Sequence, residues 1–134
     1  MVKQITFSPT GGTKKVADAI STGIGENIDA FELCNPESKL ADITLGEDDL
    51  AIIAAPVYFG RIPALAIERL KTSVNANGAK CAVVAVYGNR AYDDALLELF
   101  STCTEMGLRV VAAVGAVAEH SIVRKYGAGR PDAD

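Results

Sequence analysis

Cysteine is scarce in this chain of 134 residues, and the three cysteines lie far apart at Cys34, Cys81 and Cys103. An odd, scattered set is neither a disulfide framework nor a metal-binding motif. Cys81 and Cys103 lie in apolar segments, where the simplest interpretation is an inert core position. Cysteine usage of this kind suits a reducing compartment, so we expect a cytoplasmic protein.

Long hydrophobic runs and an excess of basic charge are also missing. The longest apolar runs, 51–56 and 110–118, are too short to cross a bilayer, so no membrane interaction is expected. Lys3 and Gln4 interrupt the amino-terminal segment, and nothing there follows the pattern of a signal peptide. The net charge is −4 and no basic stripe with interleaved aromatic residues occurs, which argues against nucleic-acid binding.

The chain does have a regular alternation of strand and helix patterns. Apolar runs typical of strands occur at 2–7, 28–33, 50–55, 81–87 and 109–117. Amphipathic patterns typical of helices span 14–25, the segment after Pro63 with Ile67, Leu70 and Val74 on one face, and 93–106 with Leu96, Leu99, Phe100 and Cys103 inward. This alternation predicts one α/β domain, 1–134, with a parallel sheet, helices on both faces and a poorly structured tail at 121–134.

The first strand runs into a loop of small residues that opens a helix. The loop contains Ser8, Thr10, Gly11, Gly12 and Thr13. Hydroxyl groups, converging backbone N–H groups and the positive end of a helix together can hold a phosphate group. The spacing fits neither a Walker A loop nor the dinucleotide pattern, which needs a third glycine. The alternative interpretation is a plain glycine-rich turn with a threonine N-cap.

Two later loops bring aromatic side chains to the same edge of the predicted sheet. They contain Tyr58, Phe59, Gly60 and Arg61, and then Gly88, Asn89, Arg90 and Tyr92. In such sheets ligands bind beyond the carboxyl ends of the strands. Tyr58, Phe59 and Tyr92 would stack on a flat conjugated ring, unless they only cover the end of the sheet. A phosphate group and a flat ring describe a mononucleotide, and flavin mononucleotide (FMN) fits best.

Three segments then resemble a known family. Ser8-Pro9-Thr10-Gly11-Gly12-Thr13 resembles the phosphate loop of flavodoxins, Phe59-Gly60 resembles their first flavin loop, and Gly88-Asn89-Arg90-Ala91-Tyr92 resembles their second. The resemblance implies a flavodoxin-like, doubly wound five-stranded parallel sheet of order 2-1-3-4-5, with the last helix short or missing.

A narrower resemblance links 56–64, 86–92 and 119–121 to the flavodoxin modules that some anaerobes fuse to a two-cluster ferredoxin. This chain has no cysteine-rich cluster motif, so it is either a stand-alone relative or the module of a longer protein. His120 lies within 119–121 and is the one histidine, for which a local turn role is the simpler interpretation.

The resemblance implies an FMN-binding electron-transfer protein whose partners are redox proteins, either ferredoxin-like or a reductase. All residues of the three loops named above would contact the cofactor, and neither a catalytic residue nor a metal site is expected. The peptide at Gly60 would turn with the redox state of the flavin, since glycine tolerates positive φ. Alternatives are an NAD(P)H-dependent flavin reductase, which usually needs a longer chain, and a flavin-free interaction module. A low-molecular-weight tyrosine phosphatase would need a cysteine at position 8 and an arginine at position 14.

The sequence departs from flavodoxins in two places. Arg61 and Arg90 replace or join the acidic residues that flavodoxins have in both flavin loops, and Asn89 takes the acidic position of the second. Positive charge favours the reduced, anionic flavin. We therefore expect a less negative second reduction potential. The end of the chain is short and rich in glycine, which would leave Val111, Ala113 and Gly115 uncovered. An open apolar face predicts a homodimer or a covering segment from a longer chain.

Overall fold

The computed structural model describes residues 1–24, 27–34, 43–58, 60–87 and 93–117. Strands and helices alternate along these residues, as the sequence predicts. The elements are β1 (Val2–Thr6), α1 (Gly12–Ile24), β2 (Ile28–Glu32), β3 (Ile43–Thr44), β4 (Leu50–Pro56), α2 (Ala64–Ser73), β5 (Val74–Asn75), β6 (Lys80–Tyr87), α3 (Asp93–Glu105) and β7 (Arg109–Val117).

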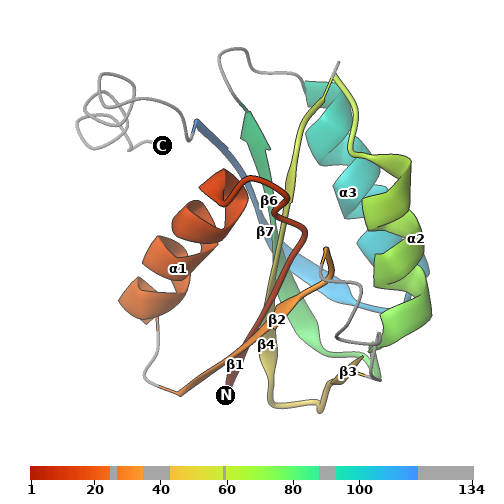
Figure 1. Ribbon diagram of the computed structural model, residues 1–134. Helices are drawn as coiled ribbons and strands as arrows, with labels where there is room; N and C mark the ends of the chain where they lie inside the picture. The colour runs from red at the N-terminus through yellow and green to blue at the C-terminus, as the bar shows by residue number, and fades with distance from the viewer. Residues whose placement is uncertain (25–26, 35–42, 59, 88–92, 118–134) are drawn as a thin grey trace.

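The main sheet has five parallel strands in the order β2-β1-β4-β6-β7 (Figure 1). When the two-residue strands β3 and β5 are left out of the count, this is the predicted order 2-1-3-4-5, which is confirmed. β1 lies between β2 and β4, so that Ile5 pairs with Phe31 on one side and with Ile53 on the other. The strand order reverses at β1, and the carboxyl ends of β1 and β4 flank that point.

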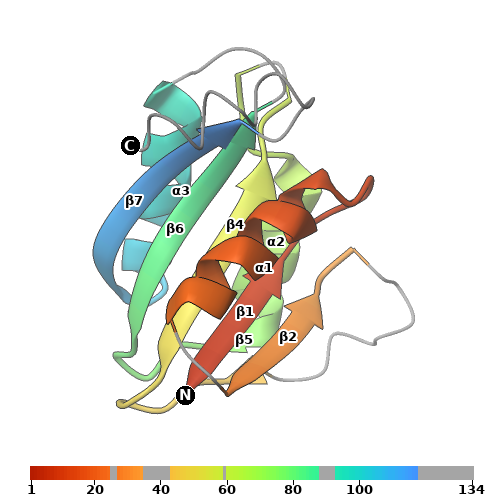
Figure 2. The same ribbon diagram turned by 90° about the vertical axis from the view of Figure 1, so that its left-hand side faces the viewer.

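Helices lie on both faces of the sheet. α1 covers one face, and α2 and α3 cover the other (Figures 1 and 2). On the α1 face Ala17 is fully buried in a cluster with Ile52 and Val84. On the opposite face Leu70 and Leu99 are buried in a larger cluster. Burial of each large apolar side chain stabilises the fold by roughly 1.5–3 kcal/mol.

The helix after Pro63 ends earlier than its apolar pattern predicts. Val74, expected on the helix face, lies beyond the last helical residue with φ −106° and ψ 127°. It pairs with Ile43 in the small sheet of β3 and β5, next to Asn75. The β-branched side chain of Val74 suits extended backbone, and its apolar character is satisfied by burial in the small sheet rather than in the helix.

The inward face of α3 is narrower than predicted. Ala95, Leu99 and Cys103 are fully or almost fully buried and lie four residues apart, so they form a single row along the helix. Phe100, expected to point inward, is 40% exposed because it lies one position beyond this row.

The strand pairing of β7 differs from the prediction, although Val111, Ala113 and Gly115, which were expected to be uncovered, are all exposed. Cys81 pairs with Val110 but Ala82 pairs with Ala112, so Val111 is an extra residue at an irregularity. An extra residue inverts the alternation of the side chains that follow it. The residues of β7 on the α1 face are therefore Ala112, Val114 and Ala116, rather than Val111, Ala113 and Gly115.

This face is open at β7, as far as the described residues show. α1 lies across the β1 and β4 side of the sheet and no described helix lies over β7 (Figure 2). Val114 is 37% exposed on this face, whereas Ala82, Val84 and Val86 of β6 are buried in the cluster that contains Ala17 of α1. The residues that would form a last helix belong to 118–134, outside the described part of the chain.

Candidate functional site

The candidate site lies at the carboxyl edge of the sheet, where β1 and β4 end side by side. The loop that follows β1 leads into α1, and a tight turn follows β4 (Figure 1). The backbone N–H of Phe7 donates to the carbonyl of Ala54 at 3.1 Å, which continues the pairing of the two strands to the edge. The topology therefore brings the first two predicted loops together at the point where strand order reverses.

The loop after β1 presents backbone donors without acceptors. Gly11 has φ +93°, a left-handed conformation that turns the chain into α1. Within the described residues, the N–H groups of Thr10, Gly11, Gly12 and Thr13 donate no hydrogen bond to the protein. Free N–H groups at a helix start, together with the helix dipole, attract an anion.

Ser8 takes part in holding the helix start itself. Its Oγ accepts a hydrogen bond from the N–H of Lys14 at 3.0 Å, and the carbonyl of Gly11 accepts from the N–H of Lys15 at 3.1 Å. Ser8 Oγ is thus an acceptor for the first turn of α1, which is a different use from the phosphate donor that the sequence suggests. Thr13 is almost fully buried, whereas Thr10 is exposed on the loop.

α1 is fixed to β1 by a chain of polar side chains. Ser21 Oγ donates to Gln4 Oε1 at 2.7 Å, and Gln4 Nε2 donates to Asp18 Oδ1 at 2.7 Å. Asp18 also pairs with Lys14 Nζ at 2.9 Å. Partial burial opposes ionisation of Asp18, but hydrogen bonds from Gln4 and Lys14 outweigh it and lower its pKa. The ammonium of Lys14 is therefore paired with Asp18.

The turn after β4 is closed by two backbone hydrogen bonds. The N–H of Tyr58 donates to the carbonyl of Arg61 at 2.9 Å, and the N–H of Arg61 donates to the carbonyl of Tyr58 at 3.0 Å. Gly60 has φ +80° inside this turn, which is a conformation that glycine adopts at little cost. The side chain of Tyr58 is 43% exposed at the edge of the sheet.

Arg61 is tied to α3. Its Nε and Nη2 donate to the two carboxylate oxygens of Glu98 at 3.2 and 3.1 Å, and the N–H of Ile62 donates to Glu98 Oε1 at 3.1 Å. The hydrogen bond from Arg61 lowers the pKa of Glu98, and that pairing raises the pKa of Arg61. The charge of Arg61, which the sequence suggests would act on a flavin, is therefore balanced by a carboxylate.

Two carboxylates that contact these loops were not predicted from the sequence. Glu98 anchors the second loop, and Glu32 at the end of β2 accepts the N–H of Ser8 at 2.8 Å. Neither residue belongs to a loop motif, and each reaches its loop only through the sheet topology. Strand register is the signal that would have found Glu32, because β1 and β2 place it beside Thr6.

Several predicted site residues lie outside the described part of the chain. They are Phe59, Gly88, Asn89, Arg90 and Tyr92, together with Glu119, His120 and Ser121 near the end of the fifth long strand. Their assignment stays a prediction.

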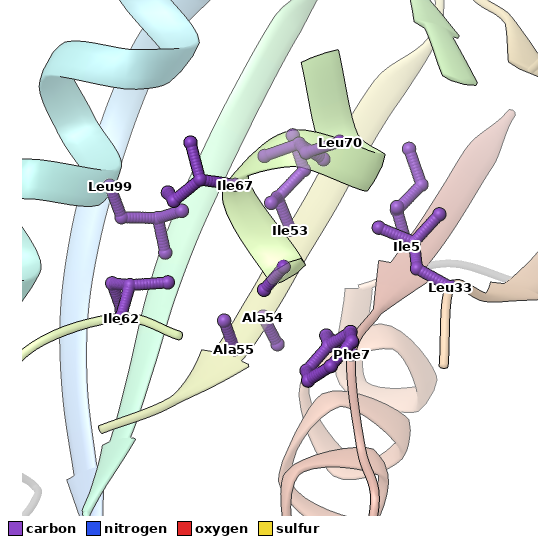
Figure 3. A pocket seen from close by; sticks show the side chains of 11 residues that line it. Ile5, Phe7, Leu33, Ile53, Ala54, Ala55, Ile62, Ile67, Leu70 and Leu99 are labelled. Atoms are coloured by element: carbon purple, nitrogen blue, oxygen red, sulfur yellow. The ribbon is translucent and has the colours of Figure 1, made fainter. Parts of the chain in front are cut away.

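An apolar hollow lies under the candidate site, between the sheet and α2 and α3 (Figure 3). Phe7, Leu33, Ile62, Ile67 and Leu99 are among its lining side chains, and all of the lining residues are apolar. A hollow without a polar group cannot recognise a phosphate or the polar rim of a flavin ring. We therefore assign it to the core and place the candidate site at the loops above it.

Two absences hold for the part of the chain that the structure describes. No group of histidine, cysteine or acidic side chains there could hold a metal ion. No described helix has the length and apolar character needed to span a membrane.

Neither the scan against protein-family models nor the search of curated proteins finds a match to this chain. Solved structures do resemble it. Two-electron reduced flavodoxin from Megasphaera elsdenii has a TM-score of 0.64 and 16% identity, with 90% of this chain and 88% of that chain covered. The flavodoxin of Streptococcus pneumoniae TIGR4 has a TM-score of 0.60 and 23% identity, with coverage of 87% and 84%.

A flavoprotein from Lactobacillus acidophilus NCFM, solved in complex with FMN, has a TM-score of 0.53 and 18% identity, with coverage of 94% and 97%. At such identities a structural likeness shows the fold and leaves the ligand open. The strand order, the helices on both faces and these neighbours agree, and the chain has the flavodoxin-like fold.

Proposed function

We propose that this chain binds FMN at the carboxyl edge of β1 and β4 and transfers electrons between redox proteins. The observation that carries the proposal is the row of backbone N–H groups from Thr10 to Thr13, which have no acceptor among the described residues. A phosphate group supplies such acceptors and is drawn to a helix start. The solved neighbours support the proposal, because they include flavodoxins and a flavoprotein with FMN bound.

The phosphate end of FMN fits the described residues. Gly11, Gly12 and Thr13 would donate backbone N–H groups, and the hydroxyl of Thr10 is exposed on the same loop. A Cβ atom at Gly11 would meet no atom within 4 Å, so the loop is open where a ligand would approach. A dianion held by neutral donors and a helix dipole needs no arginine or lysine.

The ring end of the site rests on fewer described residues. Tyr58 is exposed at the edge and Gly60 has the positive φ of a tight turn. Phe59 and Tyr92, with the loop 88–92, complete the proposed ring site on the strength of the sequence resemblance. Bound FMN would supply one- and two-electron redox chemistry, while the chain positions it and sets the charge around it.

Electron transfer is proposed over the two alternatives. A flavin reductase needs space for a second nucleotide above the ring, and a flavin-free module would not resemble flavodoxins in all three of its loops. Ferredoxin-like proteins or a reductase are the proposed partners, in the cytoplasm. A relationship to the modules fused to two-cluster ferredoxins in anaerobes is a further part of this proposal.

We also propose that the open face of β7, on the α1 side of the sheet, associates with a second copy of the chain. Val114 exposes apolar surface there, next to Ala112 and Ala116. Exposed apolar patches on a sheet face are usually covered by a partner.

Reconstitution tests the proposed cofactor. The purified chain, stripped of any ligand and mixed with FMN, is expected to retain FMN through gel filtration and to show the absorption bands of a protein-bound flavin. Retention and reduction of the bound flavin by a chemical electron donor would support the carrier role. A protein that stays colourless after reconstitution would favour the flavin-free interaction module.

A further inference from the structure

We propose that Glu32 is the positioning residue of the phosphate loop, acting through backbone contacts rather than by touching the ligand. The inference rests on the proposed binding of FMN and adds a determinant that lies outside the loop. Glu32 is the last residue of β2 and pairs with Thr6, the last residue of β1, in the strand register. Its carboxylate thus lies where the loop leaves the sheet.

Both carboxylate oxygens are used. Oε2 accepts the N–H of Ser8 at 2.8 Å and the N–H of Cys34 at 3.0 Å. Oε1 accepts the hydroxyl of Thr6 at 2.7 Å. One side chain therefore joins the end of β1, the first residue of the phosphate loop and the chain that follows β2. Hydrogen bonds to a charged acceptor are roughly twice as strong as those between neutral groups.

This arrangement fixes the position of Ser8, which in turn holds the start of α1. The backbone of Ser8 is bound by Glu32, while its Oγ accepts from the N–H of Lys14 at 3.0 Å. The loop between these two contacts carries Gly11 and Gly12, whose N–H groups are free. Without an acceptor for the Ser8 N–H, the loop would lose its anchor on the sheet and its free donors would be held less firmly for a ligand.

The negative charge of Glu32 works against an incoming phosphate, so the contact has a cost as well as a benefit. No ion pair among the described residues includes Glu32. A carboxylate beside an anion site is explained if its hydrogen bonds to the loop favour phosphate binding more than its negative charge opposes it. Solvent weakens the repulsion between Glu32 and a phosphate, because Glu32 is only half-buried. The two contributions can be separated by substitution.

Glu32→Gln keeps an acceptor and removes the charge. The amide oxygen can replace Oε2, and the amide nitrogen can donate to Thr6 Oγ1, whose hydroxyl can turn to the carbonyl of Phe31, 3.4 Å away. Glu32→Ala removes the acceptor and the charge together. Asp29→Ala is the matched control, because Asp29 lies on the same strand and its carboxylate has one polar partner among the described residues, Lys3 Nζ at 3.9 Å.

The test measures the dissociation constants of FMN and riboflavin for the four proteins and the amide exchange rate of Ser8. We expect Glu32→Ala to weaken FMN binding about tenfold or more and to leave riboflavin binding within about twofold, because the loss is confined to the phosphate end. Glu32→Gln and Asp29→Ala should keep FMN affinity within about threefold of the unmodified chain. The Ser8 N–H should exchange faster in Glu32→Ala only.

Three results would overturn the inference. They are an unchanged ratio of FMN to riboflavin affinity in Glu32→Ala, tighter FMN binding in that variant, and a Glu32→Gln protein as weak as Glu32→Ala. Failure of the unmodified chain to bind FMN would instead overturn the proposed function. In that case the amide exchange rate of Ser8 alone would test whether Glu32 positions the loop. Equal rates in Glu32→Ala and the unmodified chain would show that it does not.

Discussion

At the scale of single residues, the candidate site depends on backbone conformation as much as on side-chain chemistry. Gly11 and Gly60 both have positive φ, at +93° and +80°, and each sits in one of the two described loops at the carboxyl edge. L-amino acids with a side chain avoid this region because the Cβ atom crowds the following carbonyl. The two loops therefore owe their shape to glycine at these positions.

Replacement of Gly11 by alanine should destabilise the fold by about 1 kcal/mol, through backbone strain alone. A Cβ atom there meets nothing within 4 Å, so no clash adds to the cost. Gly23 is the matched control, because it lies in α1 and a Cβ atom there also meets nothing within 4 Å. Gly23→Ala should stabilise the fold by about 0.5–1 kcal/mol, since alanine is a better helix former than glycine. Urea unfolding of both variants measures the two effects, and the same sign for both would contradict this explanation.

Thr10→Ala should weaken FMN binding by roughly 1–3 kcal/mol and leave unfolding unchanged. Thr10 is exposed on the loop, so its hydroxyl contributes little to the fold but would be paired by a phosphate oxygen. Thr22→Ala, an exposed threonine near the other end of α1, is the control and should bind FMN as the unmodified chain does. Fluorescence titration with FMN makes the comparison, and equal affinities for the two variants would remove Thr10 from the site.

At the scale of elements, carboxylates on β2 and α3 anchor loops that belong to other parts of the chain. Glu98 on α3 holds both the guanidinium of Arg61 and the N–H of Ile62, where the second loop enters α2. The arrangement ties the turn that contains Gly60 to a helix across the sheet edge. The second loop is thereby fixed at one end by β4 and at the other by α3.

The pairing of Glu98 with Arg61 should make stability depend on pH in a defined direction. The hydrogen bond from Arg61 lowers the pKa of Glu98 in the folded chain. The ionised Glu98 therefore contributes fully to the free energy of unfolding above its unfolded-state pKa, and this contribution is lost as the pH falls through its folded-state pKa. The difference in unfolding free energy between the unmodified chain and Glu98→Gln should therefore shrink from about pH 6 to about pH 3.

Urea unfolding at several pH values checks this expectation. Glu105→Gln, at the exposed far end of α3, serves as the control. A difference for Glu98→Gln that stays constant across the pH range would mean that the contact with Arg61 does not stabilise the folded chain.

Element order was predictable because buried strands and amphipathic helices have different periods along the chain. The details that the sequence did not reveal depend on pairing between distant segments. Val74 has a side chain that fits a helix face, and only its pairing with Ile43 places it in a strand. The irregularity at Val111 likewise arises where β7 pairs with β6, and the single extra residue changes which residues of β7 share a face with α1.

The candidate site was predictable in part for the same reason. The loop from Ser8 to Thr13 is contiguous in sequence, so its glycines and hydroxyls are visible as a motif. The contacts of Glu32 and Glu98 cross the sheet and join residues that are 24 and 37 positions apart, which no local pattern records. The ion pair of Arg61 with Glu98 was therefore not predicted, and Arg61 was expected to carry an unbalanced charge.

At the scale of the whole molecule, the two faces of the sheet are covered unequally. α2 and α3 lie on one face, whereas on the other face no described helix lies over β7 (Figures 1 and 2). Val114 is at the centre of the open strand and is 37% exposed. The proposed dimer would cover this apolar strip and leave the carboxyl edge with its loops accessible to a redox partner.

Sedimentation velocity tests the association. The unmodified chain should sediment as a dimer, and Val114→Lys should sediment as a monomer with little change in thermal stability, since the valine is already partly in solvent. Leu97→Lys on α3, where the leucine is 59% exposed on the opposite side of the sheet, is the control and should remain dimeric. A monomeric unmodified chain would contradict the proposed dimer.

The comparison of FMN with riboflavin tests the central proposal most directly, because the two ligands differ only in the phosphate. Calorimetric titration of the unmodified chain should give an affinity for FMN at least about tenfold higher than for riboflavin, with inorganic phosphate weakening FMN binding. Equal affinities for FMN and riboflavin, or no binding of either, would contradict a phosphate site at the start of α1.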